Sequence, residues 1–297
     1  MKVFSKVAVA VAAVAALLVL GAVLAAGSGE AKPKQTVRVA VVADTGSLND
    51  KGFNTLAVQG LEKAEKDLGI EGRVYPSGTA ADRTPNLQAA AQAGYGLVIA
   101  NGVLFTFGPL PTVAPANPNT KFLGIDVNYP DLEGKPANVR GVQFREQEAG
   151  CLVGNIAALE AKRQGKRFIC AVGANKVTAI VRFFAGYQFC AKRANPKVKV
   201  ITQYANDPTF NDQAKCKATA LSQIARGSKV VFQVAGGCGL GAIDAAKQKK
   251  VWAIGVDADQ YFFGPHVLTS ATKHVETAVY DAITEFAKNP TARSIFV

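Results

Sequence analysis

Short β-branched runs alternate with longer amphipathic segments from Thr36 onward, and this alternation constrains the fold more than any other feature of the sequence. Residues 37–43 form a nearly continuous apolar run, which is typical of a parallel strand buried on both faces. Residues 53–68 place alanine and leucine at three- and four-residue spacing, which predicts a helix. Such strand–helix alternation predicts parallel sheets with crossover helices.

The alternation runs through the chain twice, with a restart near residue 142, and therefore predicts two lobes of similar α/β architecture, the type I periplasmic-binding-protein fold. Further strands are expected at residues 73–75, 97–100, 122–126, 168–172, 198–203, 230–234, 251–256 and 267–270. Further helices are expected at residues 86–92, 145–161, 180–193, 212–226, 240–249 and 276–287. We assign residues 36–141 and 274–297 to the N-terminal lobe and residues 142–273 to the C-terminal lobe.

The first 26 residues have the pattern of a secretory signal peptide, with a basic start at Lys2 and Lys6, an apolar run and small residues at its end. A polar linker follows over residues 27–35. The apolar run is also just long enough for an uncleaved membrane anchor. Either alternative predicts an exported chain, in the periplasm or on the outer face of the cell membrane. Ser28 lies where a lipoprotein would need a cysteine, so lipid anchoring is not expected.

The net charge of +12 does not predict nucleic-acid binding, because the basic residues are scattered and the densest group is only residues 247–250. The five cysteines lie far apart without a C-x-x-C pair, and the chain has two histidines, so neither a metal nor a cofactor is expected.

The cysteines of an exported chain predict disulfides. If the second lobe has a flavodoxin-like strand order, right-handed crossovers place the helices that carry Cys216 and Cys238 on one face of the sheet. The helices that carry Cys151 and Cys190 then share the other face. We therefore predict the pairs Cys216–Cys238 and Cys151–Cys190, with Cys170 buried and free.

Polar residues follow most of the predicted strands, at the ends where open parallel sheets bind ligands. These segments are residues 44–54, 101–102, 126, 173–176, 236–239 and 257–260. Their acids, amides and glycines suit hydrogen bonding to a polyhydroxylated ligand.

At these segments the chain resembles the basic membrane protein family of ABC-transporter substrate-binding lipoproteins, whose characterised members bind purine nucleosides. The resemblance covers about residues 36–287 and includes several specific motifs in the family's order. The matching stretches are residues 44–54 (DTGSLNDKGFN), 138–150 (NVRGVQFREQEAG), 231–239 (VFQVAGGCG), 254–260 (IGVDADQ) and 269–273 (TSATK).

The resemblance implies a ligand sandwiched between Phe53 and Phe232, one ring from each lobe. It implies that Asp44 and Asp126 accept hydrogen bonds from the base or its neighbours. Asp257 is then expected to hold the ribose hydroxyls. The same family pattern gives Lys273 the same role as Asp257 and places backbone groups of Gly236 and Gly237 close by. Asn49 and Asn54 belong to the first motif and are also expected to contact the ligand.

Purely structural roles compete with several of these assignments. Phe232 lies in an apolar strand and is compatible with a core position. Asn49 or Asp50 is compatible with a helix cap. Asp257 is compatible with an ordinary turn.

The chain departs from the family's pattern at residues 173–177 and at Cys151, where an aromatic residue is expected. The family pattern also continues beyond the position of Val297 with a further strand.

The sequence predicts binding without turnover. A Gly237-x-Gly239-x-x-Ala242 pattern matches a dinucleotide fingerprint, but it follows the third strand of its lobe rather than the first. We predict a monomeric, non-enzymatic substrate-binding component that works with an ABC transporter permease and a cytoplasmic ATPase. The alternatives are a sugar- or polyol-binding protein of the same fold and an exported nucleoside-processing enzyme.

Overall fold

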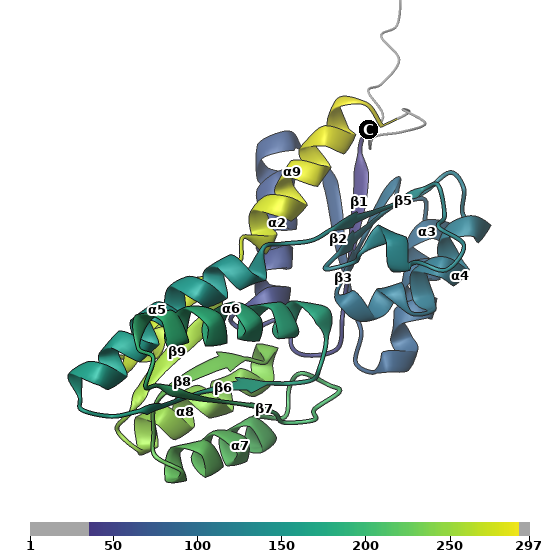
Figure 1. The fold of residues 1–297 in the computed structure, drawn as a ribbon. Helices are drawn as coiled ribbons and strands as arrows, with labels where there is room; N and C mark the ends of the chain where they lie inside the picture. Colours follow the sequence, from purple (N-terminus) through teal and green to yellow (C-terminus); the bar gives the residue numbers. More distant parts are fainter. Residues whose placement is uncertain (1–35, 291–297) are drawn as a thin grey trace, which may run out of the picture. The chain divides into compact units, whose positions relative to one another are not determined.

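The computed structural model describes residues 36–290, so the predicted signal peptide and linker lie outside the described residues (Figure 1). Within that range, ten strands form two five-stranded sheets in which every recorded pairing is parallel. The first sheet has the order β2-β1-β3-β4-β5 and the second the order β10-β9-β8-β6-β7. The first sheet contains β1 (Arg38–Ala43), β2 (Glu71–Pro76), β3 (Leu97–Asn101), β4 (Lys121–Ile125) and β5 (Val139–Val142). The second contains β6 (Phe168–Gly173), β7 (Lys199–Tyr204), β8 (Ser228–Val234), β9 (Trp252–Asp257) and β10 (Val267–Thr272).

Helices cover both faces of the first sheet because its central strands are apolar on both sides. In β1, Val39 and Val41 join one core cluster with α2 (Phe53–Leu68) and α9 (Val275–Lys288). The alternating residues Ala40 and Val42 join a second cluster on the other face. The helices of that face are α3 (Arg83–Gln92) and α4 (Pro109–Ala116).

The second sheet is covered by the helix pairs α5 (Glu146–Arg163) with α6 (Thr178–Ala194) and α7 (Gln213–Ala225) with α8 (Gly239–Gln248). Helices α5 and α6 pack closely because Gly150 and Gly154 of α5 lie against the α6 backbone at Phe183 and Tyr187. A side chain at either glycine would overlap a backbone oxygen, at 2.2 Å for Gly150 and 2.3 Å for Gly154.

The predicted disulfides are confirmed: Cys151–Cys190 joins α5 to α6, and Cys216–Cys238 joins α7 to the turn before α8. Cys170 is the free cysteine of residues 36–290, and it is buried. The order β7-β6-β8 is the flavodoxin-like order on which the pairing was predicted.

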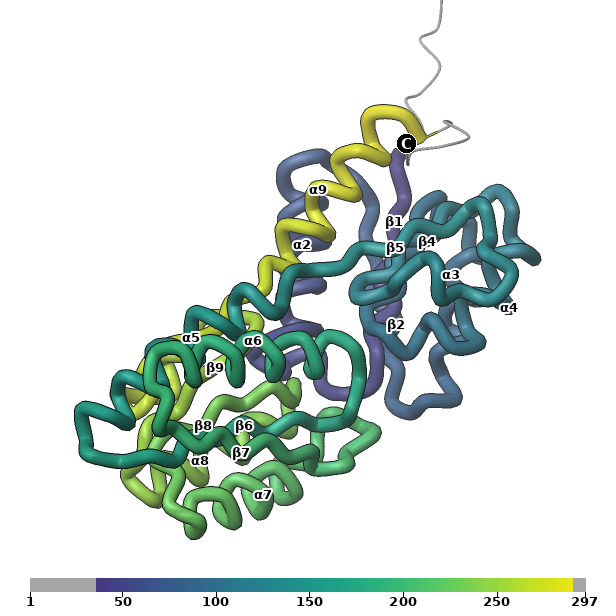
Figure 2. The backbone as a smooth tube through the Cα atoms, in the orientation of Figure 1, coloured from purple at the N-terminus to yellow at the C-terminus, as the bar shows by residue number. Residues whose placement is uncertain are grey.

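The α/β fold class and all the predicted strands and helices are confirmed, with ends that differ by a few residues. Besides short 3-10 turns, the strand β5 and the proline-rich helix α4 were not predicted. Figure 2 follows the chain as it leaves the first sheet after β5, enters α5, and returns after β10 through α9. Among residues 36–290 we find no helix with the length and apolar character needed to cross a bilayer.

Candidate ligand-binding site

A cavity of about 690 Å³, open solvent at its mouth included, lies beyond the carboxyl ends of strands from both sheets. Its first-sheet lining comprises Asp44, Thr45, Gly46, Asp50, Phe53, Asn54, Gly102, Val103 and Asp126. Its remaining lining comprises Val177, Ala179, Ile180, Phe183, Phe210, Val234, Ala235, Gly236, Val256, Asp257 and Lys273.

The turn between β1 and α2 is held in place by its own polar side chains. The Asp50 carboxylate accepts hydrogen bonds from the backbone N–H groups of Gly52, Asn54 and Thr55, at 2.9–3.1 Å. Of the two capping candidates in this turn, Asp50 therefore fixes the start of α2. The Asn54 side chain accepts a hydrogen bond from the Asn101 amide at 3.0 Å, which ties the turn to the end of β3.

Asp44 forms a buried ion pair with Arg83, whose Nε lies 2.6 Å from the Asp44 Oδ1. The Thr45 N–H also donates to this oxygen. Burial raises the pKa of Asp44 even though Arg83 and the Thr45 N–H favour the charged carboxylate.

Lys273, between β10 and α9, joins the end of a first-sheet strand to the start of α5. Its Nζ lies 2.6 Å from Asp126 after β4 and 3.4 Å from Glu146, the first residue of α5. The same ammonium group lies 5.0 Å from the Phe53 ring centroid and 4.8 Å from that of Phe144. Burial alone would lower the pKa of Lys273, but the carboxylates of Asp126, Asp257 and Glu146 outweigh it and raise that pKa. Lys273 is therefore a charged, buried link between these groups.

Asp126 and Asp257 occupy equivalent places at the ends of the fourth strands of their sheets, β4 and β9. Both adopt left-handed backbone conformations, with φ of 62° and 64°, which asparagine and aspartate tolerate better than most residues. Strained conformations of this kind cluster at functional sites. The Asp126 Oδ1 is buried without a hydrogen-bond partner, and burial raises the pKa of Asp257 to about 7. Two buried carboxyl groups therefore line the cavity, and that of Asp126 has an oxygen without a hydrogen-bond partner.

Seven of the predicted site residues line the cavity: Asp44, Phe53, Asn54, Asp126, Gly236, Asp257 and Lys273. Asn49 and Gly237 do not belong to the lining, and the exposed Asn49 side chain accepts a hydrogen bond from Lys51. We therefore leave Asn49 and Gly237 out of the candidate site.

The prediction that Phe232 stacks on the ligand is wrong. Its side chain is fully buried in the second core, at 0% exposure, and it does not line the cavity. It packs against Tyr187 and Phe183 of α6, with ring centroids 5.1 and 6.1 Å away. Phe232 lies within β8 rather than after it, so its ring points into the layer between sheet and helices.

Two aromatic residues that were not among the predicted site residues, Phe183 and Phe210, line the cavity instead. Phe183 is almost fully buried, whereas Phe210 is partly exposed in the loop between β7 and α7. The rule that ligands bind after strand ends could have selected Phe210, because it follows the end of β7. Glu146 was not among the predicted site residues, and its contact with Lys273 depends on the return of the chain after β10.

Two parallel α/β lobes with a polar cavity at their strand ends define the class of two-lobed solute-binding proteins of the type I periplasmic fold. Among residues 36–290 no group of three or more histidine, cysteine, aspartate or glutamate side chains is arranged to hold a metal ion. The chain belongs to the family described as PnrA-like ABC transporter substrate-binding proteins, which matches residues 37–295. The resemblance noted in the sequence is therefore confirmed.

Relatives support the same assignment. An uncharacterised lipoprotein of Pyrococcus furiosus is 35% identical over 289 residues, covering 93% of this chain and 71% of that protein. The ABC transporter nucleoside-binding protein BmpA of Lactococcus lactis is 34% identical over 297 residues, covering 92% of this chain and 81% of that protein. A solved solute-binding protein of an ABC transporter system from Aeropyrum pernix has a TM-score of 0.79 at 30% identity, covering 86% of this chain and 71% of that one.

Proposed function

We propose that this protein binds a purine nucleoside in the cavity and delivers it to an ABC transporter permease driven by a cytoplasmic ATPase. The observation that carries the proposal is the pairing of aromatic side chains with carboxyl groups in one cavity. Phe53 and Phe210 offer flat apolar surfaces for a base, and aromatic contacts of this kind add about 0.5–1.5 kcal/mol beyond area burial. Asp257 offers acceptors for a ribose diol, beside the Lys273 ammonium group.

Hydrogen-bonding groups for the base are available on the first lobe. The unpartnered Asp126 Oδ1 is an acceptor at the cavity, and a donor on the ligand would remove the cost of its burial. Asp44 and Asn54 are nearby polar groups of the same lining. The name of the Lactococcus lactis relative, a nucleoside-binding protein, supports the same ligand class.

We further propose that the protein is exported and acts as a monomer without catalytic turnover. The signal-like first 26 residues support export. Two disulfides are typical of proteins from oxidising compartments outside the cytoplasm. The Pyrococcus relatives are lipoproteins by name, which agrees with a location at the cell surface.

A ligand screen by thermal shift and calorimetry tests the ligand class. We expect inosine, guanosine or adenosine to raise the unfolding free energy by about 2.7 kcal/mol at a ligand concentration 100 times the Kd. Ribose, free bases, glucose and galactose should stabilise less at equal concentration. Stabilisation by a hexose but by no nucleoside would overturn the proposal in favour of a sugar-binding protein. Release of free base during overnight incubation with inosine would instead indicate an enzyme.

Truncation of either partly exposed aromatic ring should weaken nucleoside binding. We expect Phe53→Ala and Phe210→Ala each to raise the Kd about 10- to 100-fold, because each removes about 1.5–3 kcal/mol of apolar burial. Phe189→Ala on α6 is the matched control, since that ring is 62% exposed and lies outside the lining. Calorimetry should give wild-type affinity for the control, and wild-type affinity for the first two variants would contradict the proposed stacking.

A further inference from the structure

The loop of residues 207–212 forms part of the cavity wall through Phe210 and has an unusual backbone. Phe210 has a positive φ of 55°, which a bulky side chain rarely adopts, so the rest of the loop must hold it there. Thr45 of the first lobe lies across from this loop, with its Oγ1 3.5 Å from the Pro208 carbonyl oxygen. The loop thus presents an aromatic ring to the cavity and reaches toward the other lobe.

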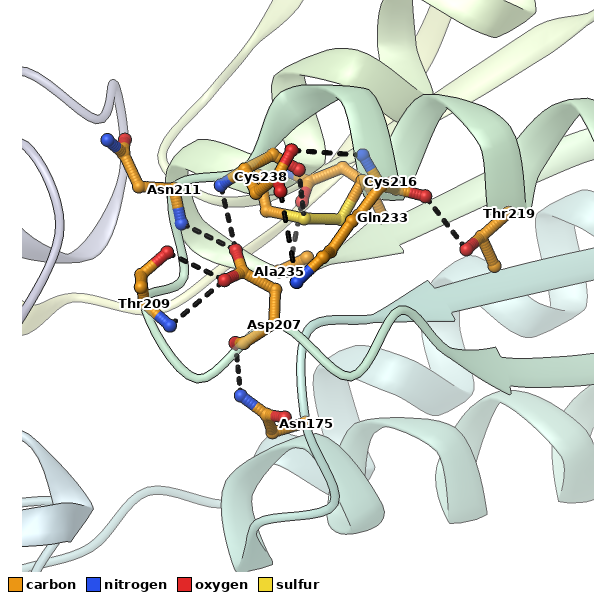
Figure 3. The surroundings of a disulfide bond; sticks show 11 residues. Asn175, Asp207, Thr209, Asn211, Cys216, Thr219, Gln233, Ala235 and Cys238 are labelled. Atoms are coloured by element: carbon orange, nitrogen blue, oxygen red, sulfur yellow. Dashed lines mark hydrogen bonds and ion pairs between the residues drawn. A yellow bond between two sulfur atoms is a disulfide. The ribbon is translucent and has the colours of Figure 1, made fainter.

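One anchor of the loop is the Asp207 side chain, whose carboxylate is surrounded by donors (Figure 3). It accepts hydrogen bonds from the backbone N–H groups of Thr209, Asn211 and Asp212, at 2.8–2.9 Å, and from the Thr209 hydroxyl at 2.6 Å. These bonds lower the pKa of Asp207 although burial acts in the opposite direction. The carboxylate therefore fixes the backbone on both sides of Phe210.

A second anchor is the Cys216–Cys238 disulfide, which lies directly behind the loop (Figure 3). The Cys238 N–H donates to the Phe210 carbonyl oxygen at 2.9 Å, and Cys216 lies in the first turn of α7, the helix that Asp212 caps. Gly236, two residues before Cys238, lines the cavity with a φ of 56°. The disulfide therefore joins the helix that follows Phe210 to the turn that contains Gly236.

We propose that the Cys216–Cys238 disulfide is a positioning element of the ligand site. It fixes the Phe210 loop and the Gly236 turn relative to one another. Neither sulfur touches the ligand in this arrangement, since both cysteines are fully buried outside the cavity lining. The inference rests on the proposed function, because it assigns to Phe210 a role in holding the nucleoside.

The second disulfide provides a matched control. Cys151–Cys190 joins α5 to α6 and neither cysteine lines the cavity. The cysteines are 39 residues apart, against 22 for Cys216–Cys238, so loop-closure entropy predicts that its removal costs at least as much stability. If affinity fell only because the fold was less stable, removal of Cys151–Cys190 would therefore weaken binding at least as much as removal of Cys216–Cys238.

The experiment compares the variants C216A/C238A and C151A/C190A, with inosine, guanosine and adenosine as calorimetric probes. We expect removal of Cys216–Cys238 to raise the nucleoside Kd about tenfold and removal of Cys151–Cys190 to change it less than about twofold. In a Phe210→Ala background, removal of Cys216–Cys238 should raise the Kd clearly less than in the wild type, because the part of its effect that acts through the Phe210 ring is then absent. An equal loss in both disulfide variants, or an undiminished loss in the Phe210→Ala background, would overturn the inference.

A measurement without ligand separates this inference from the proposed function. Hydrogen exchange at the amides of Asn211, Asp212 and Cys238 should become faster when Cys216–Cys238 is removed and stay unchanged when Cys151–Cys190 is removed. Unchanged exchange in both variants would overturn the positioning role whatever the ligand is. If exchange becomes faster but the protein binds no nucleoside, the disulfide still positions the loop. Only the nucleoside assignment is then refuted.

Discussion

Replacement of Lys273 with methionine should lower the unfolding free energy at pH 7 by about 3–5 kcal/mol, the usual cost of breaking a buried ion pair from one side. Methionine keeps the length of the side chain but leaves the Asp126 carboxylate without its cation and leaves Glu146 with Arg182 alone, whose guanidinium lies 3.6 Å away. The side chains of all three residues are at most 9% exposed, so water screens these charges only weakly. Urea unfolding measures the loss directly.

Two further variants distinguish this electrostatic cause from a general packing defect. Adding Asp126→Asn to Lys273→Met should recover part of the lost stability, because the buried carboxylate that has lost its cation is then removed. Lys217→Met breaks an exposed pair with Asp244 and should cost no more than about 1 kcal/mol. A Lys273→Met loss as small as that of Lys217→Met would show that the Lys273 ammonium group does not stabilise these carboxylates.

The fold could be predicted because the chain's apolar pattern is unambiguous at the central strands. Strands such as β1 are buried on both faces and therefore read as continuous apolar runs. The disulfide pairing also followed from the sequence, because strand order determines which helices share a face. Helix α4 was missed because it contains three prolines, which ordinarily mark loops, although Pro109 is tolerated in its first turn.

Residues of the candidate site could be predicted only where a side chain of suitable chemistry also lies at the end of a strand. Asp126 and Asp257 lie at strand ends, and the structure places both at the cavity. Phe232 was selected by resemblance although it lies two residues before the end of β8, and its ring is in the core. Phe210 follows the end of β7 and could have been selected by its position, whereas the contact of Glu146 with Lys273 is long-range and no local pattern contains it.

Nucleoside affinity should fall about 100-fold between pH 8 and pH 5 if Asp257 must be ionised to accept the ribose hydroxyls. Burial raises the pKa of this carboxyl group to about 7, and the nearby Asp126, Asp50 and Glu146 reinforce the effect against the opposing charge of Lys273. At pH 5 only about one molecule in a hundred then has the competent carboxylate. Calorimetry between pH 5 and pH 8, with a nucleoside that does not itself titrate in this range, measures the profile.

Without ligand, the contribution of Asp257 to the unfolding free energy should change with pH in the opposite direction to the affinity. A carboxyl group with a pKa near 7 in the folded protein and about 3.9 in the unfolded chain binds its proton more tightly when folded. Its contribution to the unfolding free energy therefore decreases as the pH rises from about 4 to 7, while affinity increases. The Asp257→Asn variant should bind weakly at every pH and should lose this pH dependence of both affinity and unfolding free energy. Asp259 is an exposed neighbour outside the lining, so the Asp259→Asn variant should keep both pH dependences. An Asp257→Asn variant that keeps the wild-type pH profile of affinity would assign the titration to another group and remove Asp257 from the proposed ribose contact.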